Sequence, residues 1–211
     1  LEITLADAER DLFLGDLRLK GFCDQSPRGI WLRAVGLGAR GHYAEAWGLL
    51  ESVLALDARE HDAEVSLAAS TAASFHRQLG RHVIAAGLDE YAVAIATRSP
   101  DLAGSREAEL DARIGFTADA VGRGDLNHAH RRLVLAEEIL GPPWRAGIRL
   151  GWVRTEVALL GGDVDEVLAP ALAAVAAARA VGARRHLAKS LLFLAVAHGV
   201  RGEDGLPAAH E

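Results

Sequence analysis

The sequence predicts an all-α protein built as a solenoid of αα-hairpins, with about four helix pairs and a last single helix. Three observations support this fold class. Apolar residues recur at intervals of three and four along most of the 211 residues, which is the spacing of one helix face. Strong helix formers dominate, and aromatic residues make up only 5% of the chain. Glycines close successive helical segments at nearly regular intervals.

The first helix is expected near the start of the chain. Thr4 has the properties of an N-cap, and Asp7 stands at the third helical position, where a carboxylate stabilises a helix start. This helix should end near Gly15 or Gly21, because glycine commonly follows the last turn. Residues 16–20 alternate between apolar and charged, which leaves a short strand-like arm as an alternative there.

From residue 29 the pattern becomes regular, and nine further helices are expected. Their ranges are 29–40, 43–57, 61–79, 82–97, 104–122, 126–140, 144–160, 164–181 and 184–201. The corners are marked by Gly41, Gly80, Gly124, Gly162 and Gly202, and by Ser99-Pro100 and Pro142-Pro143. The chain is therefore divided into an N-terminal segment (1–27), a repeat domain (28–202) and a tail (203–211).

The corner glycines are separated by 39, 44, 38 and 40 residues, which indicates a repeated structural unit. A small residue stands seven positions before each corner: Ala34, Ala73, Thr117, Thr155 and Ala195. Alanines also follow several corners by five positions, as Ala46 follows Gly41. Small residues at both places let two helices approach closely, so each unit is expected to be an αα-hairpin.

The segment Gly41-His-Tyr-Ala-Glu-Ala46, continued to Leu54-Ala-Leu-Asp57, resembles the consensus of a tetratricopeptide repeat. The other units are degenerate, their spacing is longer than usual, and Ala58 replaces the proline that normally closes a repeat. The resemblance covers roughly residues 28–202. It implies a right-handed helical solenoid whose inner face binds a peptide or protein, and it implies no enzyme chemistry.

In this family the groove-facing residues come from the first helix of each pair, about 13, 10 and 6 positions before the corner glycine. Carried onto this chain, the candidates for a partner-binding groove are Arg28, Trp31, Ser70, Ser74, Arg149, Trp152, Glu156 and Lys189. The pair Arg-x-x-Trp occurs twice among them, and arginine and tryptophan are enriched at binding hot spots. The alternative is that the tryptophans fill the core and the arginines stack over them.

The segment Gly36-Leu-Gly38-Ala-Arg-Gly41 offers a rival interpretation, because it is a G-x-G-x-x-G motif and Asp57 lies 21 residues after its first glycine. Such a motif is typical of a dinucleotide-binding enzyme. However, Arg33 interrupts the strand that should precede it, and no other segment supplies strands for a sheet. A third hypothesis is a regulatory domain that senses a small ligand.

Composition and scattered motifs exclude several other classes. A net charge of -6 argues against nucleic-acid binding, and no apolar run reaches the length of a membrane span. The single cysteine, Cys23, suits a reducing cytoplasm. His128 and His130 point in different directions on a helix, so no metal site is expected, nor any cofactor or catalytic group. The basic cluster around Arg184 and Arg185 is either solvated or a contact for an acidic partner.

The last helix contains seven consecutive apolar residues, from Leu191 to Ala197. One side should pack on the preceding helix pair. The remaining apolar side chains are Leu192, Phe193, Val196 and Val200. Because helices that are apolar on all sides are normally buried, and because a solenoid separates its ends, these residues predict a homodimer contact. The expected protein is a cytoplasmic, non-enzymatic module that captures a protein or peptide partner in its groove.

Overall fold

The computed structural model describes residues 3–16, 19, 21–98, 104–139, 141 and 143–211. Of these residues 76% are helical, and none of them forms a strand, so the expected all-α fold class is confirmed. The possible strand-like arm at 16–20 lies partly outside the described residues, as do Ser99-Pro100 and Pro142 at two of the expected breaks. No helix in the described ranges is both long and apolar enough to cross a membrane.

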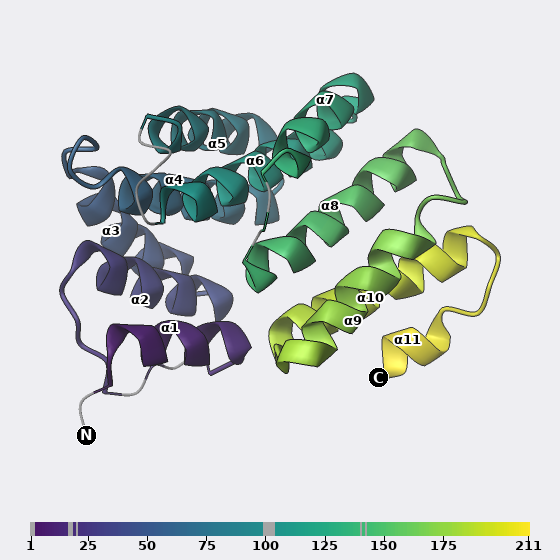
Figure 1. The fold of residues 1–211 in the computed structure, drawn as a ribbon, viewed down its shortest axis with the longest axis horizontal. Coiled ribbons are helices and arrows are strands. Elements are labelled where there is room, and N and C mark those ends of the chain that lie inside the picture. Colours follow the sequence, from purple (N-terminus) through teal and green to yellow (C-terminus); the bar gives the residue numbers. More distant parts are fainter. Residues whose placement is uncertain (1–2, 17–18, 20, 99–103, 140, 142) are drawn as a thin grey trace.

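The described residues form eleven helices (Figure 1). They are α1 (Leu5–Leu14), α2 (Pro27–Ala39), α3 (Tyr43–Leu54), α4 (Asp62–Gln78), α5 (His82–Ala96), α6 (Ser105–Gly122), α7 (Leu126–Glu137), α8 (Trp144–Gly161), α9 (Leu168–Val181), α10 (Arg184–Val200) and α11 (Leu206–His210). Thr4 caps α1 as expected, because its side chain accepts a hydrogen bond from the backbone N–H of Asp7. The short α11 lies in what the sequence suggested was only a tail.

The helix expected at 164–181 begins four residues late, at Leu168. The backbone N–H of Glu166 donates to Asp163, which holds this segment in a turn. Arg201 donates to the carbonyl oxygen of Val164 at 3.0 Å, so this oxygen is used by a distant side chain. Local turns and a tertiary contact therefore outweigh the helical pattern of the segment.

Neighbouring helices pack in pairs along the chain: α2 with α3, α4 with α5, α6 with α7, α8 with α9, and α10 with α11. The first helices of these pairs also contact one another in sequence, from α2 through α4, α6 and α8 to α10. We call these five helices the first-helix row. The candidate groove residues all belong to this row, so its arrangement decides how they meet.

The corners follow the glycine pattern of the sequence. All five corner glycines have positive φ angles between 72° and 86°, a backbone conformation that side chains with a Cβ rarely adopt. The small residues that the sequence places beside the corners lie where helices pack closely, since Ala34 and Ala46 are fully buried. At Gly38 a Cβ atom would lie 2.3 Å from the ring of Phe75, so any larger residue would force this ring on α4 to move.

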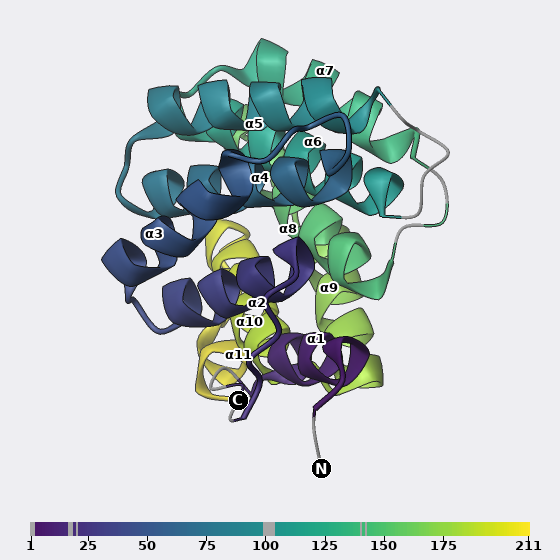
Figure 2. The same cartoon turned by 90° about the vertical axis from the view of Figure 1, so that its left-hand side faces the viewer.

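Helix α1 lies against α2 and also reaches α10, near the other end of the chain (Figures 1 and 2). A Cβ atom on Gly15, directly after α1, would lie 3.6 Å from the Cβ of Arg184 in α10. The expectation that the helical array separates its ends is therefore wrong for this chain. The first-helix row curves enough for α1 to bridge its beginning and its end.

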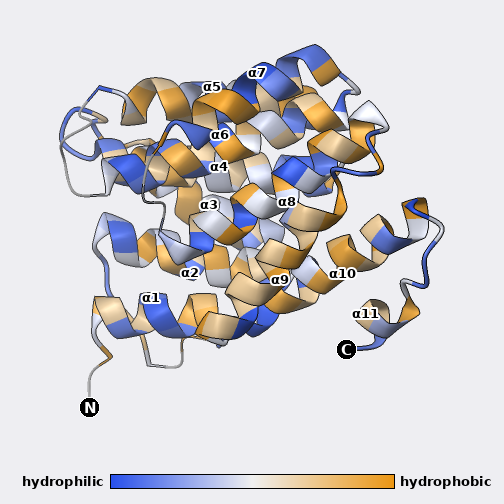
Figure 3. Ribbon diagram, turned by 45° about the vertical axis from the view of Figure 1, so that its right-hand side comes forward, coloured by the Kyte–Doolittle hydropathy of each residue, from blue (hydrophilic) through white to orange (hydrophobic). Residues whose placement is uncertain are grey.

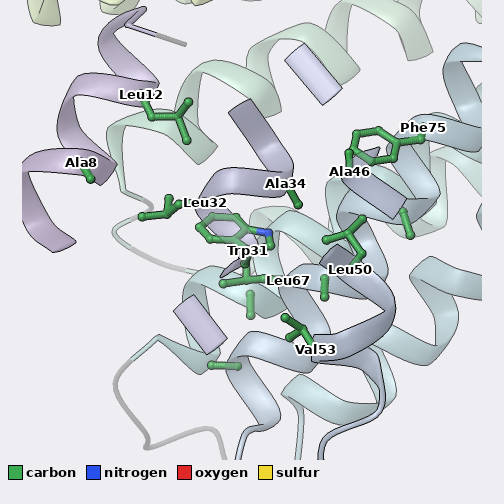
Figure 4. Close-up of a cluster of buried hydrophobic side chains, with 14 of the residues drawn as sticks. Ala8, Leu12, Trp31, Leu32, Ala34, Ala46, Leu50, Val53, Leu67 and Phe75 are labelled. Carbon is green, nitrogen blue, oxygen red and sulfur yellow. The ribbon is translucent and has the colours of Figure 1, made fainter. Parts of the chain in front are cut away.

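The apolar core is distributed along the array. In Figure 3 the helices carry both apolar and polar residues along their length, as the three- and four-residue spacing predicts. The cluster that joins α1 to α4 includes Leu12, Trp31, Leu50 and Leu67, all of them 2% exposed or less (Figure 4). This packing fixes α1 on the N-terminal helix pairs.

Candidate ligand-binding cavity

A cavity of about 260 Å³ lies on the inner side of the first-helix row. All five helices of the row line it, and α1 contributes Phe13. Seven of the eight candidate groove residues are on its wall, and they are Trp31, Ser70, Ser74, Arg149, Trp152, Glu156 and Lys189. The repeat spacing therefore brings together residues that lie as far apart in the sequence as α2 and α10. We call this cavity the cup.

Helix α1 closes the cup at the N-terminal ends of the first-helix row. Besides lining the cup, Phe13 lies beneath the guanidinium group of Arg145, which is 4.5 Å from the ring centroid. Glu9 accepts hydrogen bonds from Arg28 in the first turn of α2. Glu107, in the first turn of α6, joins this contact because it accepts from Arg28 at 3.3 Å and from Arg145 at 2.8 Å. Arg28 thus holds α1 in place and does not line the cup.

The other side of the cup reaches solvent. Gln78, at the C-terminal end of α4, lines the cup and is exposed, as are Arg185 and Lys189 on α10. A ligand can therefore enter from this side, whereas Phe13 of α1 lines the cup beside Arg145. The sequence predicted a groove on the inner face of the array, and the structure has a cavity there that α1 helps to line.

Asp111 is the buried carboxylate at the centre of the wall. It accepts hydrogen bonds from Arg145 and Arg149, both on α8. Burial raises the pKa of Asp111, but the two guanidinium groups outweigh it and hold this pKa below its ordinary value. Burial likewise opposes ionisation of Arg145, yet Asp111 and Glu107 raise its pKa above the usual range. Asp111 and Arg145 are therefore both charged and mutually neutralised.

Arg77, on the wall of the cup, forms a second buried charge cluster with carboxylates that lie behind the wall. Its Nη1 donates to Asp89 at 2.7 Å and to the carbonyl oxygen of Gly115 at 3.0 Å, and it lies 2.9 Å from Asp119. Both carboxylates have no exposed side-chain surface. Burial raises the pKa of Asp89 to about 7, although Arg77 opposes this shift. The cluster links α4, α5 and α6.

Three charged side chains of the cup make no ion pair with any described residue: Glu156, Arg185 and Lys189. Lys189 Nζ instead lies 4.5 Å above the ring of Trp152. Lys189 reaches solvent, yet the protein atoms packed around its amine exclude enough water to lower its pKa, in spite of nearby Glu156. Burial also raises the pKa of Glu156. Arg185 also has a lowered pKa because of burial. These groups are therefore available to a ligand.

The two Arg-x-x-Trp pairs have different roles. Trp31 is 1% exposed and lies among buried apolar side chains (Figure 4). Its Nε1 donates to Thr71 at 2.9 Å, and Arg28 lies over its ring. This tryptophan is a core residue, as the alternative interpretation stated. Trp152 is only partly buried and lines the cup, and its Nε1 donates to Ser190 at 2.8 Å.

The expected dimer residues do not form one surface. Leu192, Val196 and Val200 are exposed on α10, with relative exposures of 62%, 42% and 46%. Phe193 is partly buried instead, and its ring stacks on Trp152 with 6.3 Å between the centroids. The apolar outer face of α10 is therefore smaller than the sequence suggested.

The rival motifs do not form sites in the described structure. Gly36 and Gly38 lie inside α2, so no strand or phosphate-binding loop is present at the G-x-G-x-x-G motif. His128 lies beside Asp125 at the start of α7, and the described residues contain no cluster of potential metal ligands. Cys23 is an exposed free thiol.

The sequence reasoning missed the cup residue Arg145, and it named Arg185 only as part of a basic cluster and not as a groove residue. Both stand 17 positions before a corner glycine, one helical turn before the groove position at 13. Extending the repeat positions by one turn would have found them. Phe13 had no such signal, because α1 lies outside the repeat.

Comparisons of the chain with protein-family models, with curated proteins and with solved structures give no significant match.

Proposed function

We propose that this chain is a non-enzymatic binding module that resembles tetratricopeptide-repeat proteins and takes up a compact ligand in the cup. The observation that carries this proposal is the closed end of the cavity. An open groove suits an extended segment, whereas a cavity of about 260 Å³ closed by α1 suits a small molecule. This role corresponds to a ligand-sensing regulatory domain, since α1 contacts both ends of the array.

A second candidate is capture of a protein segment, which the repeat resemblance favours. Here the end of an acidic segment would enter the cup from the side of Gln78 and Lys189, both of which are exposed. This candidate predicts that peptides bind and that free small molecules do not.

The proposal is tested by screening a library of metabolites for compounds that raise the melting temperature. A ligand that binds only the folded state stabilises it in proportion to the logarithm of its concentration. Two variants that fill the cup, Ala118→Trp and Ser74→Phe, serve as comparisons, because both residues line the cavity. Compounds that bind in the cup should stabilise the original protein and neither filled variant.

Stabilisation of all three proteins to the same extent would place the ligand elsewhere and contradict the proposal. A bound compound should also be recovered chemically unchanged after prolonged incubation. Turnover of the compound that is abolished by either filled variant would show an enzyme instead.

A further inference from the structure

The cup contains more positive charge than its own carboxylates neutralise. Five cationic side chains line it. Asp89 and Asp119 neutralise Arg77, and Glu107 and Asp111 neutralise Arg145. The other three cations share only Asp111 and Glu156. Asp111 is shared between two arginines, and one of these, Arg149, has no other ion-pair partner among the described residues. Arg185 and Lys189 have none there at all. The surplus is therefore concentrated at Arg149, Arg185 and Lys189.

Lys189 is repelled by both of the other two cations. Burial lowers the pKa of Lys189, and Arg149 and Arg185 lower it further. The pKa of Arg149 is likewise lowered by burial and by nearby arginines, even though Asp111 opposes this shift. A bound anion would remove this repulsion and accept charge-assisted hydrogen bonds, which are stronger than neutral ones.

The rest of the wall is suited to an apolar group. Ile114 and Ala118 on α6 and Val35 on α2 line the cup together with Trp152. Glu156 lies near Lys189, accepts no hydrogen bond from a described residue, and has a pKa that burial raises. A ligand that carries a hydroxyl or amine in addition to its anionic group would find a polar partner here.

We infer that the ligand of the cup is a small organic anion, namely a carboxylate or phosphate monoester with an apolar portion. Its anionic group lies among Arg149, Arg185 and Lys189, and its apolar portion contacts Ile114 and the neighbouring apolar wall. The inference rests on the proposed function, because it names the chemical class of ligand for the same cavity.

The test uses a matched set of phenyl compounds as probes in isothermal titration calorimetry: benzoate, phenyl phosphate and the neutral benzyl alcohol. The anions should bind at least about tenfold more tightly than the alcohol, which is the effect of one charge-assisted hydrogen bond. Lys189→Gln and Arg185→Gln should each weaken anion binding by a similar factor. The control is Arg131→Gln, which removes an exposed arginine on α7 outside the cup and should change nothing.

The competing outcomes separate this inference from the proposed function. If benzyl alcohol binds as tightly as the anions and Ala118→Trp abolishes both, the cup binds ligands but the inferred class is wrong. If no phenyl anion binds at millimolar concentration while an acidic peptide does, the inference is wrong and protein-segment capture replaces it. If Arg131→Gln weakens anion binding as much as Lys189→Gln, binding reflects general surface charge, and the inference is also wrong.

Discussion

Replacing Asp111 with asparagine should strongly destabilise the protein, because this carboxylate neutralises two arginines in the wall of the cup. Asp111 is 4% exposed and Arg145 is 7% exposed, so neither charge is well solvated. Removing one partner of a buried ion pair costs about 3–5 kcal/mol. For a chain of this length, each kcal/mol lowers the melting temperature by about 2–4 °C, which gives a loss of about 6–20 °C for Asp111→Asn.

The matched control is Asp165→Asn. Asp165 also pairs with an arginine, Arg201, at 3.3 Å, but its side chain is 91% exposed. An exposed pair contributes about 0–1 kcal/mol, so this variant should melt close to the original protein. The assay is urea unfolding followed by circular dichroism at pH 7. A loss below about 1 kcal/mol for Asp111→Asn would refute the conclusion that this carboxylate holds the wall together.

The pH dependence of the same variant gives an independent check. The pKa of Asp111 is lowered in the folded state, so its contribution to stability is complete above the ordinary aspartate pKa of about 3.9. This contribution is lost as the pH falls through the lowered folded-state value. The difference in stability between the original protein and Asp111→Asn should therefore shrink in acid.

Three further predictions concern other parts of the molecule. Gly115→Ala should destabilise the protein by about 1–3 kcal/mol, because the added Cβ would lie 2.4 Å from Asp89 Oδ2. Gly48→Ala is the control and should be neutral or stabilising, because its Cβ would meet nothing within 4 Å. Equal effects of the two substitutions in urea unfolding would contradict this packing. The folded-state pKa of Asp89 is raised to about 7, so the contribution of Asp89 to folding stability is complete below about pH 4 and is lost as the pH rises through 7. Asp89→Asn should therefore flatten the dependence of the unfolding free energy on pH between these values. An unchanged pH dependence in this variant would exclude the titration of Asp89. Self-association through Leu192, Val196 and Val200 should appear as a dimer in size exclusion with light scattering and be split by Leu192→Glu, while a strict monomer at tens of micromolar would exclude it.

The sequence predicted those features that depend on local rules. The corners could be predicted because glycine alone readily adopts the positive φ angles that they require, as at Gly41 and Gly80. The cup residues on the first-helix row could be located because the repeat spacing places equivalent residues on one side of the array. Lys189 and Trp152 were found in this way although they lie far from Ser70 in the sequence.

The remaining features depend on contacts that no local pattern encodes. Trp31 and Trp152 both follow an arginine at the same distance and both border the cup, yet Trp31 is buried in the core and Trp152 is only partly buried. The position of α1 across the ends of other helices depends on Glu9 and Phe13 meeting residues of α2 and α8. Since Glu9 and Phe13 lie outside the repeat and far in sequence from their partners, the repeat pattern could not show that α1 would line the groove.

The closure of the cup by α1 is the central claim, and a disulfide crosslink tests it most directly. The Cβ positions of residues 15 and 184 are 3.6 Å apart, within the range of about 3.5–4.5 Å that disulfides require. Gly15 has a φ of 125°, so Gly15→Cys strains the backbone equally in the test pair and in the control pair. In a Cys23→Ser background, and with folding checked by circular dichroism, Gly15→Cys combined with Arg184→Cys should form an intramolecular disulfide under mild oxidation, detected by mass spectrometry. The control pair, Gly15→Cys with Arg131→Cys on α7, should remain reduced. Absence of the first crosslink in folded protein, or equal crosslinking of both pairs, would contradict a fixed position of α1 against α10.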